Sequence, residues 1–250
     1  MQKKFRVERI TNPEDTRLIY AHRELLQRYF SPGEVEPIGK IQMLIEKAND
    51  KTAKNPLVLM IAYHPIDENN PASLVSGNII NGDEECFGAI GYTVTLESLR
   101  KQGLASSLVD AFEGEVRDHH QNSRLIIMEG KRSSSGFWEK KGYLKVLDGK
   151  RNVNYCQSPL DFDPKTGEPL YEEVKETLRA KPLQEKKTEK EELRHCLLKS
   201  LEGISREWFT PKREKFETGE AYQRAMEYAE KVIQRNLESI RKSSKLRLGK

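Results

Sequence analysis

The feature that most constrains the fold is a strand–turn–helix joint in residues 91–114, GYTVTLESLRKQGLASSLVDAFEG. Its first five residues combine Tyr and Val with two Thr, which suit a pleated, half-buried strand. After a short turn at residues 96–99, a helix begins near Lys101 and carries apolar residues at spacings of three and four: Leu104, Leu108, Ala111 and Phe112. The pattern predicts a strand that leads directly into an amphipathic helix.

The start of this helix has the properties of an anion-binding site. Its first N–H groups have no partner within the helix, and the helix dipole adds a partial positive charge there, so a phosphate is stabilised. Gly103 and Ala105 have almost no side chain and would let a diphosphate approach the backbone, while Arg100 and Lys101 add positive charge. An ordinary strand–turn–helix with a tolerated glycine is the alternative, and spacing alone does not decide between them.

Two motifs together resemble one known family. Arg100-x-x-Gly103-x-Ala105, after a strand and at the start of a helix, resembles the acyl-CoA-binding motif of the GCN5-related N-acetyltransferases (GNAT family), Arg/Gln-x-x-Gly-x-Gly/Ala. Residues 137–143, FWEKKGY, resemble the second signature of the family, an aromatic pair followed by Glu-Lys, Gly and an aromatic residue. The resemblance covers about residues 4–156 and does not extend beyond them.

The resemblance implies an α/β (α+β) protein with the GNAT acyl-CoA N-acyltransferase fold. Its central sheet would be mixed, mostly antiparallel, and splayed between strands 4 and 5, with acyl-CoA in the gap. The expected element order is β-α-α-β-β-β-α-β-α-β. From hydrophobic pattern and turn signals we expect the strands at residues 4–10, 57–63, 73–80, 85–95, 124–128, 143–147 and 153–156.

A change of composition at residue 158 predicts three parts. Residues 1–157 would form the acetyltransferase domain, residues 158–188 a linker with a short helix at 172–179, and residues 189–250 a highly charged helical extension. Apolar stripes in residues 189–205 and 219–241 predict helices that pack on the domain, on each other or on a partner. A homodimer that buries the stripe of residues 222–240 stays possible at this stage. The basic end, residues 241–250, is expected to be frayed.

Composition sets broad limits. Charged residues make up 33% of the 250 residues, and the net charge of +4 is too small to argue for nucleic acid. An odd number of cysteines without metal-like spacing, Cys86, Cys156 and Cys196, fits a reducing compartment. The sequence has neither a long apolar run nor a signal-type apolar core near residue 1. We therefore expect a cytoplasmic protein with no membrane span, no nucleic-acid partner and no metal.

The resemblance also implies the contacts of acetyl-CoA, the expected co-substrate. The pantetheine arm would pair with Thr93, Val94 and Thr95, and Trp138 would pack beside it. A backbone N–H near the end of the central strand would polarise the thioester carbonyl. The diphosphate would be bound by the loop and first turn of the helix: Arg100, Lys101, Gln102, Gly103, Leu104, Ala105 and Ser106.

A base must remove a proton from the acceptor amine, which is protonated near pH 7. In many relatives it is a Glu on the central strand or the next one, so we expect Glu129 first and Glu85 second; solvated strand-end carboxylates are the alternative for both. Trp138 stands where many relatives have a Tyr that protonates the leaving thiolate, and indole is not a usable acid. Tyr143, Tyr92 or water would then fill that role.

The function implied is transfer of an acetyl group from acetyl-CoA to a primary amine by direct attack in a ternary complex. The acceptor, a small molecule or a protein amine, would lie near residues 29–38. Glu34 and Glu36 there either attract a cationic amine or are ordinary loop charges. The alternative function is a non-catalytic CoA-binding or interaction protein whose C-terminal helices bind a partner.

Overall fold

The structure is a computed structural model. It describes residues 5–31, 34–50, 53, 55–81, 86–119, 123–130, 134–153, 155–157, 162–170, 174–183, 189–208 and 211–249. Contacts within the chain divide it into two units, Met1–Ile126 and Ile127–Lys250, each with its own packing. The strand β5 (Ser123–Gly130) crosses this division.

Antiparallel strands form the sheet of the first unit. Its order is β1-β2-β3-β4, and β5 follows β4. Val7 pairs with Ala62, Leu59 with Ser76, and Val75 with Thr93. Every residue of β2 is buried, as its uninterrupted apolar sequence predicts. The strands are β1 (Arg6–Arg9), β2 (Leu57–His64), β3 (Asp67–Asn81) and β4 (Cys86–Thr95).

The pairing of β3 with β4 contains a bulge at Gly91. Ser76 pairs with Tyr92, but the next residue, Gly77, pairs with Ile90, so Gly91 has no opposite residue. Gly77 is itself required by close packing. A Cβ there would lie 2.2 Å from the carbonyl oxygen of Ala89 and 2.7 Å from the ring of Phe112. The irregular pairing thus lies beside a close approach of the Phe112 ring of α4 to β3.

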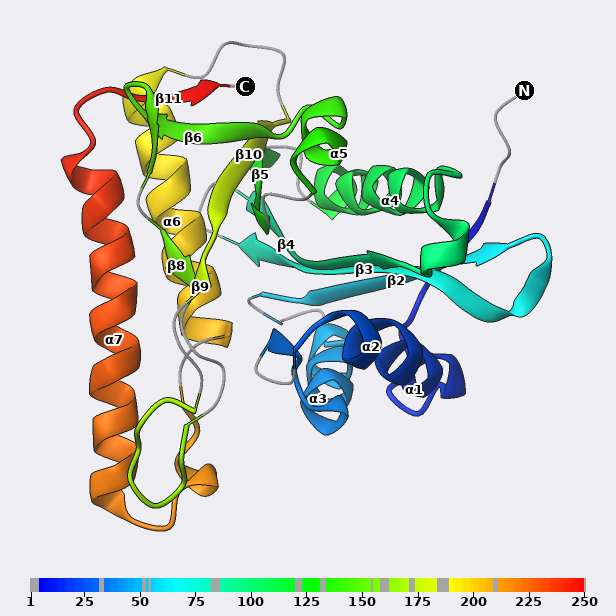
Figure 1. The fold of residues 1–250 in the computed structure, drawn as a ribbon, viewed down its shortest axis with the longest axis horizontal. Coiled ribbons are helices and arrows are strands. Elements are labelled where there is room, and N and C mark those ends of the chain that lie inside the picture. Colours follow the sequence, from blue (N-terminus) through cyan, green and yellow to red (C-terminus); the bar gives the residue numbers. More distant parts are fainter. Residues whose placement is uncertain are drawn as a thin grey trace. The chain divides into compact units, whose positions relative to one another are not determined.

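Helices cover both faces of this sheet (Figure 1). One face carries α4 (Leu104–His119), which contacts β2, β3 and β4. On the other face lie α1 (Thr16–Ala21), the π-helical turn η1 (His22–Leu26), α2 (Gln27–Tyr29) and α3 (Ile38–Ala48). The buried side of α4 follows the predicted spacing, except that Ala111 is only half-buried. Its buried apolar residues are Leu104, Leu108, Val109, Phe112 and Val116.

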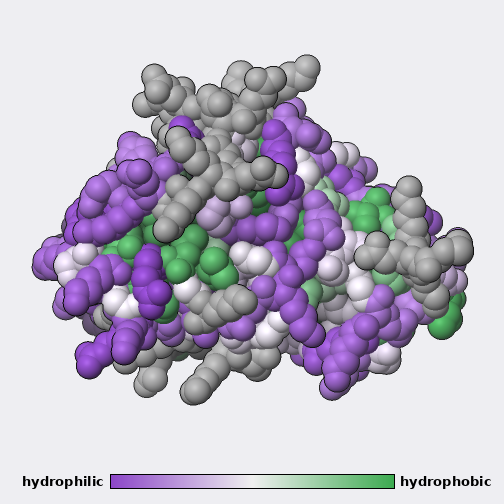
Figure 2. Space-filling view, turned by 90° about the horizontal axis from the view of Figure 1, so that it is seen from above, coloured by the Kyte–Doolittle hydropathy of each residue, from purple (hydrophilic) through white to green (hydrophobic). Residues whose placement is uncertain are grey.

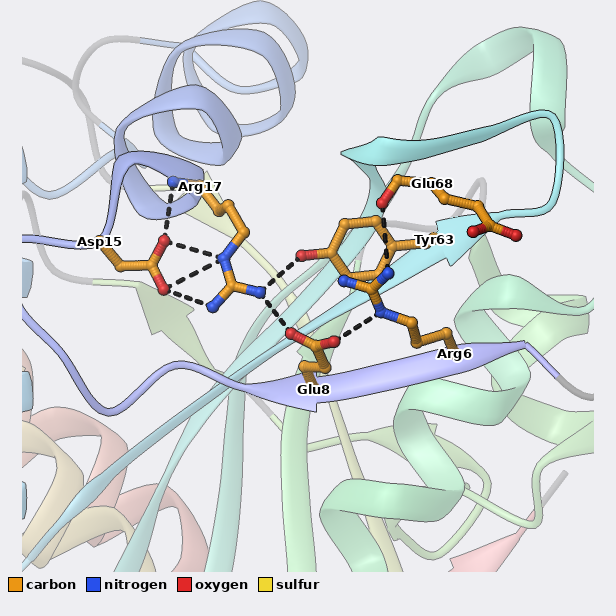
Figure 3. Close-up of polar contacts among 6 residues, drawn as sticks. All are labelled: Arg6, Glu8, Asp15, Arg17, Tyr63 and Glu68. Carbon is orange, nitrogen blue, oxygen red and sulfur yellow. Dashed lines mark hydrogen bonds and ion pairs between the residues drawn. The ribbon is translucent and has the colours of Figure 1, made fainter.

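A network of charges joins β1, β2 and the start of α1 (Figure 3). Arg17 donates to the carboxylates of Asp15 and Glu8, and its Nη1 lies 3.0 Å from the hydroxyl of Tyr63. Arg6 donates to Glu8 over 2.5 Å, and its guanidinium lies 4.1 Å from the ring centre of Tyr63. Hydrogen bonds from Arg17 lower the pKa of Asp15. Because these groups are partly exposed, the network fixes the geometry of α1 more than it stabilises the unit.

In the second unit the strand order is β5-β10-β6-β11, and β7 (Arg151–Asn152) also pairs with β6. The strands are β6 (Leu144–Asp148), β10 (Thr177–Pro182) and β11 (Leu246–Gly249). Lys145 pairs with Arg179, and Val146 pairs with Leu248, both antiparallel. A separate two-stranded sheet pairs β8 (Cys156–Gln157) with β9 (Val174–Lys175).

Two long helices, α6 (Lys190–Trp208) and α7 (Gly219–Lys242), lie side by side in this unit (Figure 1). The unit also contains α5 (Ser135–Lys140) and the 3₁₀ turn η5 (Arg213–Lys215). Most of the predicted apolar stripe of α7 is buried within the single chain, while Tyr222 and Met226 are half-buried. The homodimer considered from the sequence stays a prediction. The buried positions are Ala221, Ala225, Ala229, Val232, Ile233, Asn236, Leu237 and Ile240.

Two predictions for the C-terminal part are wrong. Residues 172–179 were expected to be helical, but β9 and β10 lie there. Residues 241–250 were expected to be frayed, but β11 pairs with β6. Helix-forming residues such as Leu178, Arg179 and Ala180 of β10 adopt a strand when they pair with a partner strand, and a local pattern does not reveal that partner. Both β10 and β11 pair with β6, which the predicted division into residues 1–157, 158–188 and 189–250 does not include. As a set of domains, this division stays a prediction.

Charged side chains lie mainly at the surface. On the face drawn in Figure 2, hydrophilic residues cover wide areas, and hydrophobic residues show between them in separate places. This agrees with the 33% of charged residues in the sequence.

Candidate functional site

The predicted diphosphate-binding loop connects η3 (Glu97–Leu99) to α4. Two of its residues have left-handed backbone conformations, Lys101 with φ 63° and Gly103 with φ 101°. The N–H of Ser107 donates to the carbonyl of Gly103 over 2.9 Å, which is an early bond of the helical ladder. The N–H groups of the first turn precede it and lie at the positive end of the helix. These features make the position a candidate phosphate site.

Side chains fasten the loop to the rest of the first unit. The Nδ1 of His64 accepts from the N–H of Ile66 over 3.2 Å, so its Nε2 carries the proton and donates to Oε1 of Gln102 over 2.9 Å. The guanidinium of Arg100 lies 5.2 Å from the ring centre of Tyr29. Contacts of Arg100 and Gln102, the residues on either side of Lys101, therefore hold the loop backbone in place.

The end of β4 supplies the residues predicted to pair with the pantetheine arm. The hydroxyl of Ser73 donates to the carbonyl of Val94 over 2.6 Å and lies 2.7 Å from Oγ1 of Thr95. The Oγ1 of Thr93 is buried and has no hydrogen-bond partner in the described part of the chain. A buried hydroxyl without a partner is costly, so it is a candidate contact for a ligand.

Tyr92 has a structural role that sequence reasoning did not find. Its hydroxyl donates to the carbonyl of Glu34 over 2.7 Å and accepts from the N–H of Glu36 over 3.3 Å. The Glu36 carboxylate pairs with Lys40 at 2.5 Å, and the Glu34 carboxylate accepts from the hydroxyl and N–H of Ser31. Both carboxylates thus have local partners, which favours the interpretation of Glu34 and Glu36 as ordinary loop charges.

In the second unit, Glu129 is half-buried near the end of β5. One of its oxygens accepts a hydrogen bond from the hydroxyl of Tyr155. Burial raises the pKa of Glu129 to about 7; the Tyr155 hydrogen bond lowers it and the charge of Glu176 raises it further. Burial also raises the pKa of Tyr155, and the neighbouring Glu129 adds to that effect. A carboxyl that titrates near neutral pH is suited to take a proton from an amine.

Trp138 and Tyr143 pack against each other. Their rings lie edge to face with centroids 5.1 Å apart, and the N–H of Tyr143 donates to the carbonyl of Trp138 over 2.9 Å. Tyr143 is fully buried. The burial and the ring contact indicate that the Tyr143 ring has a packing role. A role of Tyr143 as an acid stays a prediction.

Several polar residues around β5, β6 and β10 were not found from the sequence. Arg179 is buried on β10, where Nη1 donates to the carbonyl of Tyr143 over 3.2 Å and Nη2 to the hydroxyl of Ser135 over 2.6 Å. Burial lowers its pKa. Tyr155 and Glu176 are two further polar residues that the sequence analysis did not identify. No motif marks any of them, since their roles depend on strand pairings formed only in the folded chain.

Glu85, the second candidate base, lies outside the described residues. Within the described ranges, no group of three or more His, Cys, Asp or Glu side chains is placed to hold a metal ion. None of the helices there combines the length and the apolar character that a membrane span requires.

Comparison with known proteins gives a family match and similar folds. The family model of FR47-like proteins matches residues 76–152, which include β4, the loop and α5. No curated protein matches the sequence. A GNAT-family protein from Bacteroides thetaiotaomicron is 17% identical, with a TM-score of 0.50 over 80% of this chain and 99% of that one.

Two other solved structures are similar at lower scores. The NatC complex bound to Gag peptide and CoA contains a chain 15% identical, with a TM-score of 0.49 over 72% of this chain and 99% of that one. Ard1 from Thermoplasma volcanium is 13% identical, with a TM-score of 0.45 over 72% and 99%.

The fold class predicted from the sequence, mixed α/β with a mostly antiparallel sheet, is therefore confirmed. The separation of strands 4 and 5 stays a prediction. The resemblance read from the two motifs is confirmed as well: residues 76–152 match the FR47-like family, and the chain has the fold of GNAT acetyltransferases.

Proposed function

We propose that this protein is an N-acetyltransferase that moves an acetyl group from acetyl-CoA to a primary amine, by direct attack in a ternary complex. The observation that carries the proposal is the loop before α4. It follows β4, contains two left-handed residues at Lys101 and Gly103, and ends at a helix N-terminus. That combination binds a phosphate through backbone N–H groups, which suits the diphosphate of CoA.

Other parts of the first unit fit the rest of acetyl-CoA. The buried hydroxyl of Thr93 offers a donor or acceptor to the pantetheine arm. The bulge at Gly91 leaves backbone groups of β4 without a partner on β3. We propose one of these N–H groups as the donor that stabilises the negative charge on the thioester oxygen during attack.

Glu129 is the proposed base. Its carboxylate takes a proton from the acceptor ammonium, and the neutral amine nitrogen then attacks the thioester carbon. The C–N bond forms, the C–S bond breaks, and the second amine proton passes to solvent water as the amide forms. Because Trp138 cannot supply a proton, we propose that the CoA thiolate leaves as such or is protonated by water.

Acetyl-CoA binding gives the first test, measured by calorimetry on the wild type, Gly103→Glu and Gly103→Ala. Any side chain at Gly103 strains the loop, because φ is 101°. The Ala variant reports that strain alone, and the Glu variant adds a carboxylate beside the diphosphate. We expect micromolar binding by the wild type, weaker binding by Gly103→Ala and none by Gly103→Glu. A folded wild type that does not bind acetyl-CoA would refute the proposal.

Turnover gives the second test. Release of free CoA thiol is followed with small amines, polyamines and peptides with free N-termini or Lys as acceptors. We expect Glu129→Gln to keep acetyl-CoA binding and to lose most of its turnover, on the order of the 10²–10⁴-fold that general base catalysis contributes. Glu227→Gln, an exposed carboxyl on α7, is the matched control and should leave turnover unchanged.

Trp138 favours a second candidate function. Without an acid at that position, the chain could bind CoA without catalysis and act as an interaction protein through its C-terminal part. CoA binding without turnover of any acceptor in the panel would support this alternative. For either function we expect a cytoplasmic location, which cell fractionation with a tagged protein would check.

A further inference from the structure

The candidate base is held by residues of the C-terminal part of the chain. The contact begins at Tyr155, whose side chain is almost fully buried and whose hydroxyl donates to Glu129. A hydroxyl that donates to a carboxylate limits the rotamers of that carboxylate and stabilises its charged form.

Tyr155 is in turn fixed by residues far along the chain. The N–H of Glu176 donates to the carbonyl of Tyr155 over 3.4 Å. The side chain of Asn236 of α7 forms hydrogen bonds with both backbone groups of the next residue, Cys156. Its N–H donates to Oδ1 over 3.0 Å, and its carbonyl accepts from Nδ2 over 2.7 Å. Asn236 is buried, so these bonds are shielded from water.

The titratable groups that act on Glu129 are Tyr155 and Glu176, and Cys156 and Glu176 act on Tyr155. Glu129 lies on β5, Tyr155 directly precedes β8, and Cys156 is the first residue of β8. Glu176 lies between β9 and β10. The effects of Tyr155 and Glu176 on Glu129 oppose each other. The Tyr155 hydrogen bond lowers the pKa of Glu129, and the negative charge of Glu176 raises it.

We propose that Tyr155 and Glu176 are positioning residues for Glu129, and that Asn236 of α7 holds them in place. In this proposal Glu176 and Asn236, which belong to the C-terminal part of the chain, help to position the base. This inference rests on the proposed role of Glu129 as the base. Its physical content is that the Tyr155 hydroxyl orients the Glu129 carboxylate, while the backbone of Glu176 and the side chain of Asn236 fix the chain around Tyr155.

The experiment is an NMR titration of the full chain labelled with ¹³C at the Glu side-chain carboxyls. The resonance of Glu129 is assigned by its absence from Glu129→Gln. We expect Tyr155→Phe to shift the titration of Glu129 upward, by about one pH unit, since one hydrogen bond to a charged group is lost. We expect Glu176→Gln to shift it downward, because a negative charge is removed.

Matched variants in the same unit test whether the shifts are specific. Tyr222→Phe removes a hydroxyl on α7, next to the ring of Phe216. Glu227→Gln removes an exposed carboxyl of the same helix. Neither should move the titration of Glu129. If Tyr155→Phe fails to fold, the half-exposed Glu176 still provides a test.

Opposite shifts in Tyr155→Phe and Glu176→Gln would support the inference. No shift, or shifts in the same direction, would overturn it, whether or not the protein has activity. The pH profile of kcat/KM separates this result from the proposed function. If the NMR shifts occur and the acidic limb of the profile does not follow them, the positioning is correct and Glu129 is not the base.

Discussion

Replacement of Glu129 by Gln should stabilise the protein at alkaline pH while it removes the proposed base. The side chain is half-buried, and its pKa is raised from an ordinary 4.5 to about 7. At pH 8 the folded protein therefore contains a partly buried carboxylate that is repelled by the charge of Glu176. Gln has nearly the same shape, its amide oxygen can accept from Tyr155, and it carries no charge.

The size of the effect follows from linkage. Because the folded pKa is above the unfolded one, the contribution of Glu129 to stability is complete below about pH 4.5 and is lost as pH rises through about 7. The difference between 4.5 and about 7 corresponds to roughly 3 kcal/mol at 1.36 kcal/mol per pH unit. Since the side chain is partly exposed, we expect about 2 kcal/mol of this between pH 5 and pH 8.

The assay is urea unfolding of the wild type and Glu129→Gln at pH 5, 6, 7, 8 and 9. The free energy of unfolding of Glu129→Gln, relative to that of the wild type, should rise by about 2 kcal/mol from pH 5 to pH 8. Glu227→Gln is the control and should show a difference that does not depend on pH. A constant difference between Glu129→Gln and the wild type over this range would refute both the raised pKa and the suitability of Glu129 as a base near neutral pH.

Three further predictions concern the supports of the site. His64→Leu removes the donor to Gln102, and we expect acetyl-CoA to bind several-fold more weakly in calorimetry, with the melting temperature changed little. Asn236→Ala leaves both backbone groups of Cys156 without their partners and should lower the free energy of unfolding by about 2–3 kcal/mol in urea. A chain that ends near residue 158 lacks β10 and β11, and we expect it to be less stable than the full chain. Because β10 and β11 both pair with β6, we now expect circular dichroism to show that its second unit does not fold cooperatively.

Local signals determined the first unit well. The alternation and apolar runs of β1, β2 and β3 depend on side chains within a few residues of each other, and so does the spacing of α4. The loop was predicted because Gly103 and Ala105 have almost no side chain and because they belong to the motif that begins at Arg100, all of which are local properties. The left-handed backbone of Lys101 gave no such signal.

The second unit shows the limit of that reasoning. Residues 177–182 contain Thr, Leu, Arg, Ala and Lys, which suit a helix as well as a strand, and only the pairing with β6 decides between them. The same holds for β11, which lies about a hundred residues from its partner strand in the sequence.

The sequence by itself therefore determined the class of fold, and it predicted a phosphate-binding loop and Glu129 as a candidate base. These depend on periodicity and on a motif that local residues carry. Only the tertiary structure decided what surrounds Glu129. A pKa depends on burial and on charges brought near by folding, and Tyr155, Glu176 and Asn236 come together from distant parts of the chain.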